Sequence, residues 1–420
     1  MADSNAAVAT ELYPQRWLCL VGMVIVLFTM QFSLIIMPGI APYIMQEMQL
    51  TPAQFGMLAN TPYLAGLLFG IITGNWGDRI GIKKIMIFAI CFFIVGAWWR
   101  AFAHSFLWLF VSSLVMGFGL AVMNANSTKG IRLWFPGKNM GIAMGIYVAG
   151  ASIGAGVALK CGALWGTKTS LLVSAIASLV AMAVWVFMYK THPAESGDKS
   201  STVGMDAFKA VMKDKNVWLV SLMIMFVFGI STTAQTYMNA SLGILSGGNM
   251  GLVGTIALVS TIFVALSSIF GPAVVARFKT FRGVMIAACA ILAAFTASIL
   301  FFPFGIATWI TIIGFSLFMG VILAMGKTVP ALLPGIDPRN LGAVGGLQST
   351  LQNLGGWLIC GYIIAPIAQS MYPSVDGGIT FGLNCYQAIY IGAAICILLA
   401  AVCIFLLPKN TPSHLEIGEE

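Results

Sequence analysis

The sequence predicts an all-α membrane protein with twelve transmembrane helices in two related bundles of six. The chain has 420 residues, of which 59% are hydrophobic and only 8% charged, so too few polar residues remain to cover a water-soluble surface. Its apolar runs are about 20 residues long, which is the length that crosses a bilayer as a helix. Features of the first half recur in the second half at nearly constant offsets, which indicates an internal repeat.

The predicted spans follow the apolar runs in order. Those of the first bundle are 17–37, 54–75, 85–103, 106–134, 140–163 and 169–189. Those of the second bundle are 217–241, 249–275, 283–302, 308–333, 341–366 and 385–407. The domains are therefore a first bundle over 1–189, a linker over 190–216, a second bundle over 217–408 and a tail over 409–420. Within the linker, 206–213 has the pattern of a short amphipathic helix at the membrane surface.

Basic residues gather in alternate loops and predict the orientation. One side carries Arg16, the cluster Arg79, Lys83 and Lys84, and the linker lysines, whereas the opposite loops hold little beyond Arg100 and Lys168. Positive residues stay on the cytoplasmic side. We therefore expect a multi-pass protein of the cell membrane with both termini and the linker in the cytoplasm.

Two lysines stand at matching positions of the repeat. Lys129 and Lys327 each end an apolar run, and each precedes a proline, Pro136 or Pro334, by seven residues. A charge within a membrane helix costs roughly 2.5–3.5 kcal/mol on insertion scales, so two at one register call for an explanation. Repeated bundles place a binding site between them near the middle of the membrane. The alternative is that both side chains reach the cytoplasmic surface.

The sign of the embedded charges favours an anionic ligand. None of the thirteen Asp and Glu and none of the three His falls in the interior of a predicted span. The embedded charges are thus Lys129, Lys327 and, nearer the outer surface, Lys160, which we expect to reach the headgroups. A site with two cations is stabilised by an anion, which offsets their desolvation, and repels a lipophilic cation.

Polar side chains in the spans are candidates to complete the site. Tyr147 and Gln348 occupy equivalent positions of the repeat and are the preferred pair of hydrogen-bond donors. The further candidates are Gln31, Tyr63, Asn126 and Gln235. Each could instead make a hydrogen bond between helices, the usual role of such groups in membranes. Glycines such as Gly145 and Gly346 are expected to serve helix packing, with helix sliding as the alternative.

The segment Gly74-Asn-Trp-Gly-Asp78-Arg79-Ile-Gly81-Ile-Lys83-Lys84 resembles the loop signature of the major facilitator superfamily. The match lies between spans two and three and departs from the family at Ile82, where a basic residue is usual. The resemblance implies the major facilitator fold. It also implies that Gly74, Asp78, Arg79, Gly81 and Lys83 form a conformational latch.

A second segment, Arg132-x-Trp134-Phe135-Pro136-x-Lys138-x-x-Gly141, is similar to the junction of spans four and five in prokaryotic anion porters. Oxalate–formate exchangers, cyanate-type permeases and nitrate porters carry such runs, although the Asn of the nitrate signature is missing here. Drug–proton antiporters usually have an Arg where Ser113 stands and a proline in span five, and both are absent.

The resemblance therefore implies a secondary active transporter of a small organic or inorganic anion, with a carboxylate favoured. It would work by alternating access, as an exchanger or a proton symporter. The alternative is a multidrug–proton efflux transporter, and a membrane sensor is a further one.

Other classes of function are not indicated by the sequence. No set of catalytic residues, metal-ligand cluster or phosphate-binding loop is visible, so we expect no enzyme activity, no metal and no cofactor. The eight cysteines lack CxxC spacing and are expected to pack as small apolar residues. The expected partners are a small anion and the lipid bilayer, with no nucleic acid, and the protein is expected to be a monomer.

Overall fold

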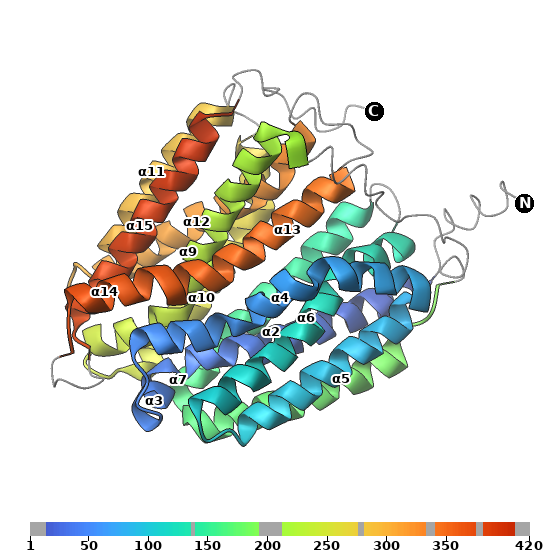
Figure 1. Ribbon diagram of the computed structural model, residues 1–420, viewed down its shortest axis with the longest axis horizontal. Helices are drawn as coiled ribbons and strands as arrows, with labels where there is room; N and C mark the ends of the chain where they lie inside the picture. The colour runs from blue at the N-terminus through green and yellow to red at the C-terminus, as the bar shows by residue number, and fades with distance from the viewer. Residues whose placement is uncertain are drawn as a thin grey trace, which may run out of the picture. The chain divides into compact units, whose positions relative to one another are not determined.

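The computed structural model describes residues 14–135, 139–192, 212–275, 281–332, 341–374 and 381–407, and their regular secondary structure is entirely helical (Figure 1). The helices before the linker are α2 (Arg16–Gly39), α3 (Ala41–Glu47), α4 (Pro52–Ile80), α5 (Ile82–Ala101), α6 (Phe106–Trp134) and α7 (Asn139–Met188). Those after it are α9 (Lys215–Leu245), α10 (Met250–Val275), α11 (Phe281–Ser298), α12 (Ile306–Leu332), α13 (Leu341–Leu358), the π-helix η3 (Ile359–Ile364), α14 (Ala365–Met371) and α15 (Leu383–Phe405).

These helices follow the predicted spans. Within the described residues, nine helices are long and apolar enough to cross a membrane. One of them, α7, holds two predicted spans, because the backbone leaves the helical conformation at Gly166 (φ 71°, ψ −178°). The shorter apolar helix α11 and the helix α4 correspond to the two remaining spans. The all-α membrane class is confirmed.

The chain forms two compact units. Unit 1 comprises Met1–Ile44 and Thr61–Thr202, and unit 2 comprises Met45–Asn60 and Val203–Glu420. The predicted domain boundaries stay a prediction, and the units differ from them in that the first part of α4 belongs to unit 2. The change of unit falls beside Pro62, where α4 lacks a backbone N–H donor. The predicted surface helix over 206–213 lies, apart from its last two residues, outside the described residues.

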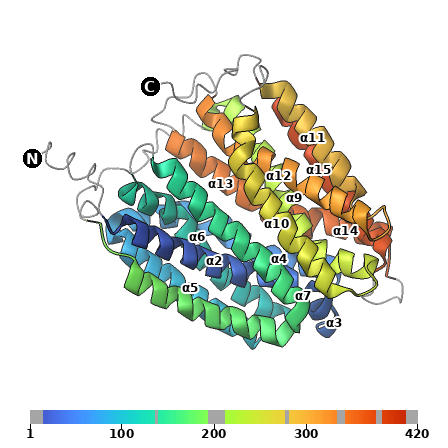
Figure 2. The ribbon, with the colours of Figure 1, turned by 180° about the vertical axis from the view of Figure 1, so that it is seen from behind.

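Unit 1 is built on a close contact between α2 and the first half of α7, which lie side by side in Figure 2. A Cβ on Gly154 would stand 2.5 Å from the carbonyl oxygen of Phe28, and one on Gly162 would stand 2.6 Å from the carbonyl carbon of Gly39. Membrane helices associate by such close packing, because lipid supplies no hydrophobic drive between them. The packing role expected for the glycines of span five holds for Gly154. For Gly145 and Gly346 it does not, since nothing lies within 4 Å of a Cβ added at either position.

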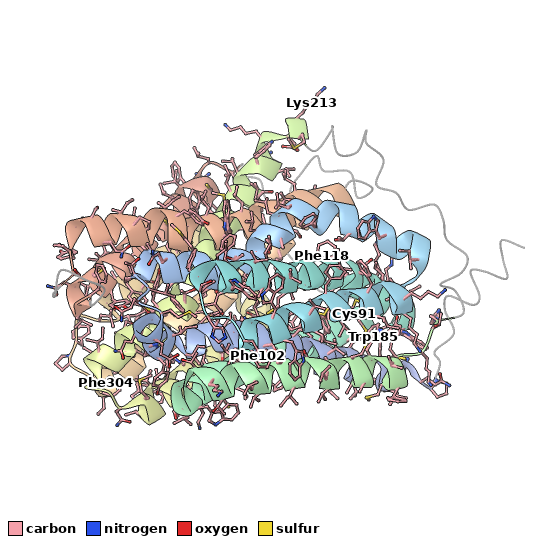
Figure 3. All side chains as sticks on the ribbon, turned by 60° about the horizontal axis from the view of Figure 1, so that its bottom comes forward. Cys91, Phe102, Phe118, Trp185, Lys213 and Phe304 are labelled. Carbon is pink, nitrogen blue, oxygen red and sulfur yellow. The ribbon has the colours of Figure 1, made fainter. Side chains whose placement is uncertain are left out.

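The second half of α7 runs antiparallel to both α2 and α5. The Ser33 hydroxyl of α2 donates to the carbonyl of Ser174 at 2.9 Å. Near the predicted cytoplasmic end, the Lys83 ammonium donates to the Val186 carbonyl at 3.4 Å, and the Trp185 indole N–H donates to the Lys83 carbonyl at 3.1 Å. Figure 3 labels Trp185 in this region, and Phe102 just beyond the other end of α5.

Unit 2 repeats the glycine contact and adds the first part of α4. A Cβ on Gly355 of α13 would collide with the carbonyl oxygen of Met225 on α9. On α9, the Tyr237 hydroxyl donates to the carbonyl of Pro52 at 2.6 Å. The Asn60 amide donates to the Thr236 hydroxyl at 3.2 Å, so α4 is fixed to α9 by polar contacts at both ends of this part.

We predict that Gly154→Ala destabilises the protein by roughly 1–3 kcal/mol, because the added methyl overpacks the contact with Phe28. Gly145→Ala is the matched control on the same helix, since nothing lies within 4 Å of the place of its Cβ. The control should be neutral or stabilising by up to about 1 kcal/mol, because alanine favours helix over glycine. Thermal unfolding in detergent measures both, and equal stability losses would contradict the packing role.

Candidate functional site

The two predicted site lysines occupy the same place in their helices. Lys129 lies on α6 and Lys327 on α12, each five residues before the last residue of its helix. The Lys129 side chain is half-buried, and the Lys327 side chain is exposed although its helix is strongly apolar. Each unit thus carries a lysine at the same distance from the end of its own helix, and the predicted role of the pair in one site stays a prediction.

A hydrogen bond from the neighbouring span reaches each lysine-bearing helix beside the lysine. In unit 1 the Tyr147 hydroxyl of α7 donates to the Ser127 hydroxyl at 2.7 Å. In unit 2 the Gln348 amide of α13 donates to the carbonyl of Gly326 at 3.2 Å. Tyr147 and Gln348 are only 7% and 8% exposed, so their polar atoms are engaged in this structure. Their predicted contact with substrate stays a prediction, and their observed contact orients the helix that carries the lysine.

The other candidate polar residues divide into two groups. Asn126 is fully buried, and its amide donates to Thr73 on α4 at 3.2 Å and to Val122 in its own helix at 2.8 Å. It therefore joins α4 to α6. Gln31, Tyr63 and Gln235 are half-buried on α2, α4 and α9. Asn126 thus serves the packing of unit 1, and the contact of all four side chains with substrate stays a prediction.

The predicted latch segment is largely helical. We expected span two to end at residue 75 and a loop to follow, but α4 continues to Ile80. The first residue that breaks the helix is Gly81, which has φ 90° and precedes α5. Only glycine adopts that conformation at little cost, so Gly81 makes the tight turn. Lys83 contacts α7, as described above, whereas the side chains of Asp78 and Arg79 are not described. The latch role of these residues and of Gly74 stays a prediction.

The burial of one charged residue, Arg100, was not predicted from the sequence. Arg100 was expected in an outer loop, but it lies in the last turn of α5 and is only 1% exposed. Its guanidinium donates to the carbonyl of Ser33, in the turn of α2 that precedes Pro38. The sequence carries no signal of this burial, because Arg100 stands at the very end of an apolar run, where a loop and a last helical turn look alike.

Among the described residues, no group of three His, Cys, Asp or Glu could hold a metal ion. All eight cysteines are free, and five of them are buried. Pro136, Lys138 and Pro334 lie outside the described residues, so their part of the predicted repeat stays a prediction.

The fold defines a class of protein, an all-helical multi-pass membrane protein. The sequence matches the model of the Major Facilitator Superfamily over residues 21–359, and the chain belongs to this superfamily. It is a member of a transporter family and not an enzyme.

Relatives and solved structures agree with this membership. The chain is 30% identical over 143 residues to the gallate transporter of Pseudomonas putida, and the matched region covers 34% of this chain and 32% of that protein. It is 31% identical over 170 residues to the probable sulfoacetate transporter of Cupriavidus necator, covering 39% and 38%. These matches thus span about a third of each relative.

In fold, the chain is similar to a bacterial homologue of the human lysosomal transporter Spinster, solved inward-facing and occupied. The TM-score is 0.78 at 14% identity, covering 94% of this chain and 97% of that one. This likeness confirms the predicted fold.

We predict an interaction between Tyr147 and Ser127 of about 0.6 kcal/mol, the average for hydrogen bonds between membrane helices. A double-mutant cycle of Tyr147→Phe and Ser127→Ala, read out by unfolding in detergent, measures it. Strictly additive losses would show that the hydroxyls do not interact and would remove the proposed orienting contact.

Proposed function

We propose that the protein is a secondary transporter that moves a small organic or inorganic anion, with a carboxylate favoured, across the cell membrane by alternating access. The observation that carries the proposal is the lysine at one register of each repeat, Lys129 on α6 and Lys327 on α12. Membership of the Major Facilitator Superfamily supports transport as the activity.

Two of the relatives support the choice of an anion. Gallate and sulfoacetate, named in two of them, both carry a carboxylate that is ionised at neutral pH. Lipophilic cations would be repelled by two lysines, whereas an anion would offset the cost of keeping them within apolar helices. In this proposal Lys129 and Lys327 each supply positive charge to an anionic substrate.

The supporting residues have different roles in this proposal. Tyr147 and Gln348 hold the lysine-bearing helices from the neighbouring spans. Gln31, Tyr63 and Gln235, which are half-buried, are the side chains that we assign to the polar edge of the substrate, with Asn126 supporting the α4–α6 contact. The latch segment around Asp78 and Arg79 regulates closure in this proposal.

Two coupling modes suit this arrangement. In exchange, closing around two lysines is unfavourable until an anion enters, so uptake needs substrate on the far side. In proton symport, an anion that binds a neutral lysine brings a proton with it, so a pH gradient drives uptake. Uptake by empty and by preloaded proteoliposomes, with and without a pH gradient, separates the two modes. We propose a monomer with both termini in the cytoplasm.

We predict that Lys129→Gln and Lys327→Gln each lower anion uptake by about tenfold or more, because a charged hydrogen-bond partner of the substrate is lost. Uptake of labelled carboxylate into proteoliposomes measures the effect at matched protein amounts. Lys160→Gln is the matched control, a half-buried lysine on α7 that the proposal keeps out of the site. Wild-type uptake in both site variants would refute the assignment.

We predict that small mono- or dicarboxylates raise the melting temperature of the detergent-solubilised protein, because a ligand of the folded state stabilises it by mass action. The increase should vanish in Lys129→Gln and Lys327→Gln. Inorganic anions, a neutral pentose and lipophilic cations complete the screen. Stabilisation by lipophilic cations alone would replace the anion proposal with drug efflux.

A further inference from the structure

Arg100 is a buried cation in unit 1 that the proposed transport does not use. Its guanidinium donates to the carbonyl of Ser33, and its Nε is buried without a hydrogen-bond partner. None of the side chains that the structure describes in unit 1 is a carboxylate. A positive charge in the interior of a membrane protein needs a counter-charge or strong acceptors, and a neutral carbonyl supplies only part of this.

On the neighbouring helix α7, two further hydrogen-bond donors are buried without a partner. The hydroxyls of Thr167 and Ser170 are inaccessible and make no hydrogen bond. These residues are three apart in the second half of α7, so they lie on one face of the helix. The next residues of that face, Ser174 and Ser178, differ, since their hydroxyls donate to the carbonyls of Leu171 and Ala175 in their own helix.

The antiparallel registers bring these groups to one level. Lys83 of α5 lies beside Val186 of α7, and Arg100 follows Lys83 by seventeen residues, so it lies level with Thr169. The hydroxyl of Ser33 contacts Ser174, and Arg100 donates to the carbonyl of Ser33. This carbonyl therefore lies near the level of Ser174, one helical turn beyond Ser170 along α7. Along α7, Ser170 thus lies between the level of Arg100 and the level of its acceptor on Ser33.

The three groups of this cluster, Arg100 Nε and the hydroxyls of Thr167 and Ser170, can all donate a hydrogen bond. One of them, the guanidinium of Arg100, carries a full positive charge. Buried polar groups without protein partners mark places where water or an ion binds. A ligand that accepts from all three and neutralises the charge is a small anion. We propose that Arg100, Thr167 and Ser170 hold a small inorganic anion, with chloride as the natural occupant, inside unit 1.

This anion differs from the transported one in place and in role. Lys129 lies on α6 and Lys327 in unit 2, whereas the cluster belongs to α5 and α7. Since Arg100 is only 1% exposed, its anion is a resident of the folded unit. It neutralises the charge that joins α5 to α2.

The test compares chloride with gluconate at constant ionic strength in the purified, full-length protein. The background is the double variant Lys129→Gln/Lys327→Gln, which removes binding at the proposed transport site. Chloride should raise the melting temperature by roughly 2–4 °C with saturation, and bromide should replace it. Equal melting temperatures in chloride and gluconate would overturn the proposal and leave water as the partner of the cluster.

Variants locate the effect. Ser170→Ala should weaken the chloride dependence, and Arg100→Gln should abolish it. Ser178→Ala is the matched control, because Ser178 is equally buried on the same helix but its hydroxyl is already bonded. If Arg100→Gln does not fold, Ser170→Ala and Thr167→Val decide. A chloride dependence that is the same in Ser170→Ala and Ser178→Ala would refute the site while leaving the transport proposal untouched.

Discussion

The close approach of span five to span one, repeated by span eleven and span seven, is the contact on which both units depend. Gly154 lies against the carbonyl of Phe28, and Gly355, 201 residues later, lies against the carbonyl of Met225. In each place a Cβ would collide with backbone, which cannot move aside as a flexible side chain can. Because lipid gives helices no hydrophobic reason to associate, such contacts fix their positions.

The helices of these two glycines also carry the side chains that reach the lysine-bearing helices. Tyr147 precedes Gly154 by seven residues, and Gln348 precedes Gly355 by seven. Seven residues are about two helical turns, or about 10 Å along a helix. A rigid helix therefore carries the glycine contact at one level and the hydrogen bond to Ser127 or Gly326 at another. The repeat conserves this geometry although a tyrosine in one unit corresponds to a glutamine in the other.

The sequence predicts those features that depend on the membrane itself. The bounds of α6 are those of the apolar run 106–134, because length and hydropathy decide where a helix can cross. Features that depend on neighbouring helices were harder to predict. Arg100 could not be recognised as buried, since its burial comes from packing against α2. Span two was predicted to end at residue 75, although nothing between that residue and Gly81 breaks the helix.

Accessibility separates the roles of the embedded cations. A transported ion has to enter and leave, so the charge that binds it has to meet solvent at some stage of the cycle. Lys327, which is exposed within an apolar helix, meets this condition, and Arg100 does not. An anion bound at Arg100 would leave only if α2, α5 and α7 moved apart, which the glycine contact between α2 and α7 opposes. Burial thus makes one cation suited to a resident ion and exposure makes the other suited to a substrate.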